Sequence, residues 1–272
     1  MTAPGAETDT GTDAGMVRAT VGEGHQPVTI TAALRTGVCL NPPYGLDLAG
    51  LLATRMRRQR DGQRAATGPY AHDPQPDSTV EDPADLDLPL SIAHDGRDWS
   101  WLASCAILPD PLPDLEPRFH YRVSDTDWAS RAAHRPLPQI LPSAGSYRDM
   151  MLPAPVLPVT TLTWRAVGDP AAIAALLDPV WAVGKRRATG EGRVLGWQVT
   201  PGPAGEDPLR WAYVGQDGQI LRPIMAGVAE HLGVDYELGW YARRPPSWHP
   251  DRLAQLAMTP PSEDWDFADG WD

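Results

Sequence analysis

The sequence has few of the features that would place it outside the cytoplasm. Among its 272 residues are only two cysteines, Cys39 and Cys105, too few for a disulfide framework or a cysteine-based zinc site. No run of about 18 apolar residues is present to span a membrane. The N-terminus also lacks the basic and apolar regions of a signal peptide. We therefore expect a cytoplasmic protein without membrane contact, with both cysteines buried as small apolar side chains.

Lysine is nearly absent, and the chain is acidic. Lys185 is the one lysine among 23 basic residues, and the formal net charge is -12. Such a charge at first argues against a nucleic-acid partner. However, 15 of the 35 acidic residues lie in segments 1–27, 71–87 and 262–272, so the rest of the chain is slightly basic. Arginine offers a planar fork to phosphate and stacks on bases. High-GC coding explains an overall arginine excess, but it does not explain arginine clusters.

Composition divides the chain into one domain and three polar segments. Residues 1–26 hold almost no large apolar side chains and are predicted to form a disordered tail. Residues 27–258 form the predicted domain, residues 61–87 a Pro- and Asp-rich insertion within it, and residues 259–272 an acidic tail.

Hydrophobic periodicity predicts an α+β fold. Strands are expected over 28–40, 118–123, 157–168 and 193–201, helices over 46–60 and 169–183, and hairpins over 88–108 and 209–224. This order favours a ferredoxin-like (RRM-like) split βαβ core with insertions. Trp164, Trp181 and Trp197 lie in the predicted elements and are expected in the core.

A basic, glycine-rich loop, "VGKRRATGEGRV" at 183–194, precedes the last predicted core strand. It follows a helix and lacks a Ser or Thr after its lysine, so it is neither a dinucleotide fingerprint nor a Walker A motif. Its glycines would allow backbone N–H groups to converge, and its other residues add charge and a hydroxyl group. This chemistry suits a sugar–phosphate backbone, although an ordinary solvated turn would have the same composition. The candidate contacts are Gly184, Lys185, Arg186, Arg187, Thr189, Gly190, Gly192 and Arg193.

Other candidates lie outside the loop. The end of the first helix carries Arg55, Arg57, Arg58, Arg60 and Arg64. These arginines suit RNA or a neighbouring subunit, but cations at a helix C-terminus also complement its dipole. Tyr147 and Arg148 offer a stacking plane and a phosphate fork, or ordinary loop packing. Trp248 and His249 are expected to be packing residues.

Five stretches together resemble a known family. "GDPAAIAALLDPVWAVGKRRATGEGRVLGWQV" is similar to the C-terminal helix, glycine-rich loop and strand of the RAMP superfamily, and more closely of the five-prime-handle-binding (Cas five-like) subunit of type IV CRISPR complexes. "VTITAALRTGVCLNPPYGLDLAGLLA", "GSYRDMMLPAPVL", "GQILRPI" and "RRPPSWHP" agree with it in order, over roughly residues 28–258. Two features depart from the family pattern: Glu191 replaces an aromatic residue in the loop, and Tyr44 and Asp47 occur where a histidine is usual.

The resemblance implies a non-catalytic subunit without metal or cofactor. Such a subunit binds the 5′ handle of the guide RNA and contacts a helical backbone subunit and a large subunit of the effector complex. It would meet target nucleic acid only indirectly, because the guide reads the target by base pairing. The loop residues, Arg55, Arg58, Tyr147 and Arg148 are then the expected RNA contacts.

Two alternatives stay open. A metal-independent endoribonuclease that processes guide RNA would use a general base and a cation. His120, His134, Tyr147 and Lys185 are its candidates, but no spacing joins them into one site. A protein-only interaction module, favoured weakly by the acidic segments, would make no RNA contact.

Overall fold

The computed structural model describes residues 16–40, 44–65, 86–122, 150–245 and 252–260 as a mixed α+β structure with small antiparallel sheets. The central sheet has β2 (Gln26–Leu34) between β7 (Thr161–Gly168) and β8 (Val194–Pro201). Both neighbours run antiparallel to β2. Alternate residues of β2 are buried on one face of the sheet, as the period-2 pattern predicts.

An irregular segment continues this sheet beyond β7. The Ser104 and Ile107 amides donate to the carbonyl groups of Arg165 and Thr163, and isolated bridges pair residues 103 and 107 with β7 in antiparallel orientation. The spatial order is therefore β8, β2, β7 and then residues 103–107.

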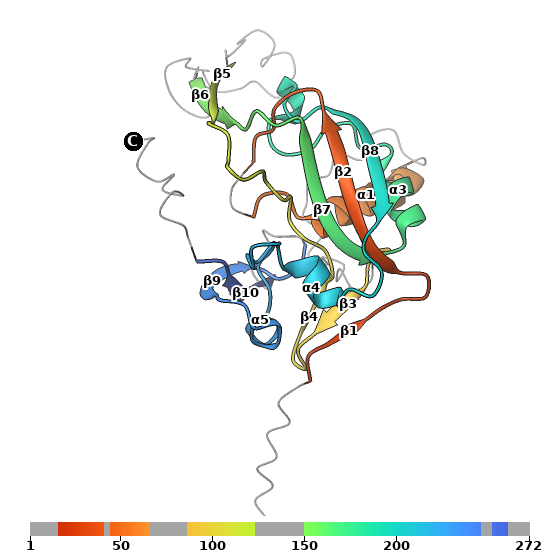
Figure 1. The fold of residues 1–272 in the computed structure, drawn as a ribbon. Helices are drawn as coiled ribbons and strands as arrows, with labels where there is room; N and C mark the ends of the chain where they lie inside the picture. The colour runs from red at the N-terminus through yellow and green to blue at the C-terminus, as the bar shows by residue number, and fades with distance from the viewer. Residues whose placement is uncertain (1–15, 41–43, 66–85, 123–149, 246–251, 261–272) are drawn as a thin grey trace, which may run out of the picture.

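Two helices cover one face of the central sheet (Figure 1). They are α1 (Leu48–Ala65) and α3 (Pro170–Leu177). The Asp169 carboxylate accepts from two amides of the first turn of α3, and Pro170 stands at its first position. Beneath the helices, Trp164 is fully buried and its indole N–H donates to the carbonyl oxygen of Leu46 at 3.0 Å.

The remaining elements form a second cluster and a hairpin. The second hydrophobic cluster is built mainly by α4 (Pro208–Tyr213), α5 (Ala226–Leu232), β9 (Glu237–Ala242) and β10 (Leu253–Met258). Beside it lies the sheet of β1 (Arg18–Thr20), β3 (Ile92–His94) and β4 (Trp99–Trp101). The pair β5 (Glu116–Arg122) and β6 (Met150–Val156) lies at the opposite end of the molecule (Figure 1).

Arg222, from the "GQILRPI" stretch, joins the two hydrophobic clusters. Its side chain is 3% exposed and lies 3.4 Å from the carboxylate of Asp47, just before α1. It also donates to the carbonyl oxygens of Trp101, Ala103 and Arg243. Burial is the largest single effect and lowers the pKa of the Arg222 guanidinium, but the Asp47 carboxylate together with Tyr213, Cys105 and Tyr241 outweighs it, so the net pKa is raised and the side chain stays charged.

Most predicted elements are confirmed. The strands at 28–40, 118–123, 157–168 and 193–201 correspond to β2, β5, β7 and β8, the two helices to α1 and α3, and the hairpin at 88–108 to β3–β4. Both cysteines are buried, as expected. Within the described ranges, no helix has the length and apolar character needed to cross a membrane.

Several expectations need correction. The predicted hairpin at 209–224 is wrong, because its first arm is helix α4, although Val214 and Ile220 still pair across the turn. The strands β6, β9 and β10 and helix α5 were not predicted. Within the expected tail 1–26, β1 pairs with β3. Trp181, expected in the core, is 58% exposed, while Trp197 is half-buried against the core.

Candidate nucleic-acid interface

The glycine-rich loop is anchored on a short antiparallel ribbon at its base. The Val183 amide donates to the carbonyl oxygen of Gly192, and the Val194 amide donates to that of Trp181, both at 2.9 Å. On the other side, the Lys185 and Gly192 amides donate to the carbonyl oxygens of Cys39 and Gly37 at 2.8 Å. Main-chain hydrogen bonds therefore hold the base of the loop in a fixed position, and this base determines where the tip lies.

Two of the glycines are required by close backbone contact. Gly184 has φ +78°, and a Cβ atom there would lie 2.7 Å from the Cys39 carbonyl oxygen. Gly192 has φ +65°, and a Cβ atom there would lie 2.0 Å from the Val183 carbonyl oxygen. Gly190 also has positive φ, +99°, but faces open space. The glycines thus shape the loop, and two of them exclude any side chain.

Several backbone N–H groups of the loop are already used within the chain. The amides of Lys185, Thr189, Gly190 and Gly192 donate to carbonyl oxygens of the chain itself. The Thr189 hydroxyl donates to the Arg186 carbonyl oxygen at 2.8 Å. The loop therefore offers an anion mainly its charged side chains, and the residues carrying them, Lys185, Arg186, Arg187 and Arg193, are all exposed.

Glu191, the loop's departure from the family pattern, points away from solvent. The residue is 3% exposed, and Nη1 of Arg118 on β5 lies 3.0 and 3.1 Å from its two carboxylate oxygens. This pair ties the β5–β6 hairpin to the loop. It also neutralises the one carboxylate that would repel phosphate there.

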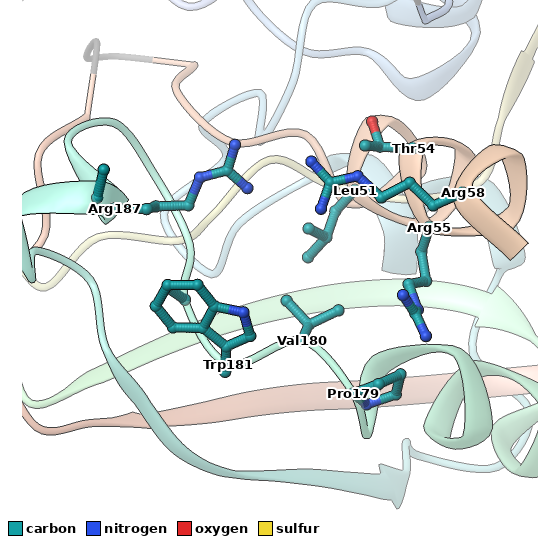
Figure 2. Close-up of a pocket in the computed structure, with 10 residues that line it drawn as sticks. Leu51, Thr54, Arg55, Arg58, Pro179, Val180, Trp181 and Arg187 are labelled. Carbon is teal, nitrogen blue, oxygen red and sulfur yellow. The ribbon is translucent and has the colours of Figure 1, made fainter. Parts of the chain in front are cut away.

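A groove of about 390 Å³ lies between α1 and the loop. It is lined by Leu51, Thr54, Arg55, Arg58, Pro179, Val180, Trp181, Ala182, Arg187 and Ala188. Figure 2 shows the guanidinium groups of Arg58 and Arg187 pointing toward one another across the groove, with Arg55 directed toward Pro179. The structure thus brings together three predicted contacts from two elements far apart in sequence. The predicted contacts Lys185 and Arg186 lie outside the groove lining.

The groove arginines form a positive site. None of the ion pairs found among the described side chains involves Arg55, Arg58 or Arg187. The Nε of Arg55 is buried without a hydrogen-bond partner in the described structure. Positive side chains that converge attract anions from solution. The groove therefore fits a phosphate group.

Trp181 is the groove residue that sequence reasoning misplaced. Its ring is 58% exposed, and the Arg193 guanidinium lies over it, 5.5 Å from the ring centre. Trp197 takes the inner position instead: its ring lies 5.6 Å from that of Trp164, and its N–H donates to the Val180 carbonyl oxygen at 2.9 Å. The predicted helix over 169–183 contained Trp181, but α3 ends at Leu177, and Pro179 between them was the available signal.

Several candidates lie outside the described residues. These are Tyr147, Arg148, His134, Trp248 and His249, and the side chains of Arg60, Arg64 and His120. Arg57 is half-buried beside the groove arginines on α1 but does not line the groove. In the described part of the chain, no cluster of three or more His, Cys, Asp or Glu residues could hold a metal ion.

A protein-family model matches most of the chain. The family model described as CRISPR type IV associated protein Csf3 matches residues 26–259, which span α1, the β5–β6 hairpin, the groove and the glycine-rich loop. No curated protein matches the chain.

Proposed function

The chain belongs to the Csf3 family of type IV CRISPR associated proteins, and from this membership we propose that it is the subunit that binds the 5′ handle of the guide RNA. The groove between α1 and the glycine-rich loop is the proposed contact. One observation carries the proposal: Arg55 and Arg58 of α1 meet Arg187 of the loop around a groove that also exposes Trp181. Arginine forks for phosphates beside an exposed aromatic ring are the chemistry of single-stranded RNA binding.

The fold we propose is a variant of the ferredoxin-like core expected from the RAMP resemblance. The sheet order β8, β2, β7 and residues 103–107, with α1 and α3 on one face, supports it. In this variant the second core strand is replaced by the irregular segment at residues 103–107. The glycine-rich loop then leads into the last core strand, β8.

The proposed role is non-catalytic. The groove is lined by arginines, apolar side chains and one threonine. A guanidinium stays protonated at neutral pH and does not act as a general base. RNA cleavage remains an outcome of the experiment below, because the side chains of His120, His134 and Tyr147 lie outside the described residues.

We also propose that the chain caps the complex through protein contacts. Leu238, Trp240 and Leu253 are 53%, 70% and 46% exposed. Their register places them on one face of the β9–β10 pair, away from the buried Leu256. An apolar face of this kind suits contact with a neighbouring subunit. The helical backbone subunit and the large subunit are the proposed partners, and target nucleic acid is met only through the guide.

The test is purification of the tagged full chain with its genomic neighbours and a repeat–spacer transcript, followed by sequencing of bound RNA. Guide RNAs with one shared 5′ end support the proposal. RNA-free protein contradicts it and favours the interaction module, whereas RNA cut by the chain alone favours the endoribonuclease.

A charge-matched comparison then tests the groove. Changing Arg58 and Arg187 together to Ala should weaken binding of the recovered RNA and lower its salt slope by about 1.4, at about 0.7 per phosphate contact on a single strand. Changing Arg18 and Arg97 together to Ala removes two exposed arginines on the β1–β3–β4 side of the molecule and should change neither. Equal slopes for the two variants would remove the groove from the RNA site.

A further inference from the structure

The exposure of Trp181 is a property of its backbone position. Its carbonyl oxygen accepts from the Val194 amide, and the next residue, Ala182, pairs with Arg193 in the ribbon at the base of the loop. Ala182 is buried, so the alternation of the ribbon turns Trp181 outward. The indole is therefore held at the groove by main-chain pairing.

The groove combines two chemistries on separate walls. Pro179, Val180 and Trp181 form an apolar side that includes a flat aromatic ring. The other side is formed by the guanidinium groups of Arg58 and Arg187, which point toward one another (Figure 2). A volume of about 390 Å³ falls in the range of small-ligand sites, about 300–1,000 Å³. A ligand with a planar ring and an adjacent anion fits both walls, and a nucleotide is such a ligand.

We propose that this groove is a subsite for one unpaired nucleotide of the bound RNA, whose base stacks on Trp181 while its phosphates pair with Arg58 and Arg187. This inference rests on the proposed RNA-binding function. Arg193 lies over the indole and holds its orientation through a cation–π contact. Stacking accepts every base because each has a π-face. The subsite therefore recognises an unpaired base at a fixed place without specifying its identity.

The experiment pairs a change in the protein with a change in the RNA. The probe is the RNA that co-purifies with the complex, resynthesised with single abasic positions along its 5′ handle. With the unchanged protein, one abasic position should lower affinity about tenfold, the scale of one base–aromatic stack. With Trp181→Ala, the intact RNA should bind about tenfold more weakly, and the same abasic position should have no further effect. The salt slope should be unchanged, because no phosphate contact is lost.

Two further variants at the same position separate the loss of the aromatic plane from a general loss of packing. Trp181→Tyr keeps an aromatic plane and should recover most of the affinity, whereas Trp181→Leu keeps apolar bulk and should not.

Each remaining outcome overturns a distinct statement. If no RNA co-purifies, the proposed function itself fails. If RNA binds, but the loss of affinity caused by Trp181→Ala adds to the loss caused by every abasic position, then RNA binding stands and the stacking subsite is wrong. If Trp181→Ala leaves RNA affinity intact but releases a protein subunit from the complex, Trp181 is a protein contact and the subsite is wrong.

Discussion

At the scale of single residues, Glu191 shows how a basic loop accommodates an acidic residue. Its carboxylate is nearly buried, whereas the side chain of its partner Arg118 is 42% exposed. Burial is the largest single effect and lowers the pKa of the Arg118 guanidinium, but the charges and hydrogen bonds of Glu191 and Glu116 together raise it overall. The pair makes the loop more positive toward solvent and fixes the β5–β6 hairpin against it.

A double-mutant cycle measures this pair. Arg118→Ala, Glu191→Ala and the double variant should give a coupling energy of about 1 kcal/mol in the free energy of unfolding, because solvent around Arg118 screens the contact. Arg118→Ala should cost more than Glu191→Gln, since it leaves a buried carboxylate without its partner. The exposed pair of Arg118 with Glu116 is the control, with expected coupling near zero. Equal coupling for both pairs would show that Glu191 does not anchor the loop.

Tyr213 gives the molecule a predictable response to alkaline pH. Burial raises its pKa from 10.0 to about 12, and its hydroxyl lies within hydrogen-bond distance of Ser100 and donates to the Trp101 carbonyl oxygen. Between pH 10 and 12 the unfolded chain loses this proton and the folded chain keeps it. The free energy of unfolding should therefore fall with rising pH in that window and be unaffected by this group below it.

Tyr213→Phe should remove the contribution of one ionisable group from this pH dependence of the free energy of unfolding. Denaturant titrations at several pH values should show a shallower decline for the variant, by up to about 1.4 kcal/mol per pH unit. Cys105 and Tyr241 also have raised pKa values through burial, so part of the decline remains. An identical decline in both proteins would contradict the assignment to Tyr213.

At the scale of secondary-structure elements, sequence patterns predicted those strands and helices that a few neighbouring residues determine. The alternation in β2 and β7 and the Asp-Pro start of α3 are decided within a few residues. Helix α4 also begins at an Asp-Pro pair, Asp207 and Pro208, and its buried Leu209 and Tyr213 lie one turn apart. The aromatic and β-branched residues of "WAYV" favour a strand by propensity, but the capped start of the segment makes it a helix.

Other elements depend on contacts that no local pattern contains. The strand β6 carries Pro153 and Pro155, which ordinarily argue against a strand, and it forms in a two-stranded pair with β5. The short strand β1 exists through its pairing with β3, far along the chain. Tertiary pairing decides such elements, and a single sequence does not reveal it.

The glycine-rich loop gives a prediction at this scale. Gly190→Ala meets only the cost of positive φ, about 1–2 kcal/mol in the free energy of unfolding. Gly192→Ala adds a collision with the Val183 carbonyl oxygen and should cost more. Urea denaturation of the two variants compares the same substitution two residues apart. If Gly192→Ala is tolerated as well as Gly190→Ala, the ribbon at the base of the loop is not as described.

At the scale of the whole molecule, the candidate site is formed when the chain folds and brings distant segments together. The sequence identified Arg55, Arg58 and Arg187 as candidates separately, but their meeting depends on how α1 and the loop pack against the same sheet. The choice between Trp181 and Trp197 for the interior likewise depends on which indole reaches Trp164. Trp181 lies in a predicted helix and Trp197 in a predicted strand, and both were expected in the core, so only the packed structure separates them.

The joint between the two hydrophobic clusters provides the last prediction. Arg222→Met keeps most of the side-chain volume but removes the ion pair to the Asp47 carboxylate and one hydrogen-bond donor from each of three carbonyl oxygens. Removing one partner of a buried pair costs about 3–5 kcal/mol, so Tm should fall by about 6–20 °C at about 2–4 °C per kcal/mol. Asp47→Asn is the control: it keeps an oxygen acceptor for Arg222 and should lose less stability.

Because Arg222 contacts elements of both clusters, Arg222→Met should also broaden the thermal unfolding transition, as the clusters begin to unfold separately. A sharp transition with unchanged Tm would mean that apolar packing alone joins the two halves, and Arg222 would then have no structural role at the joint.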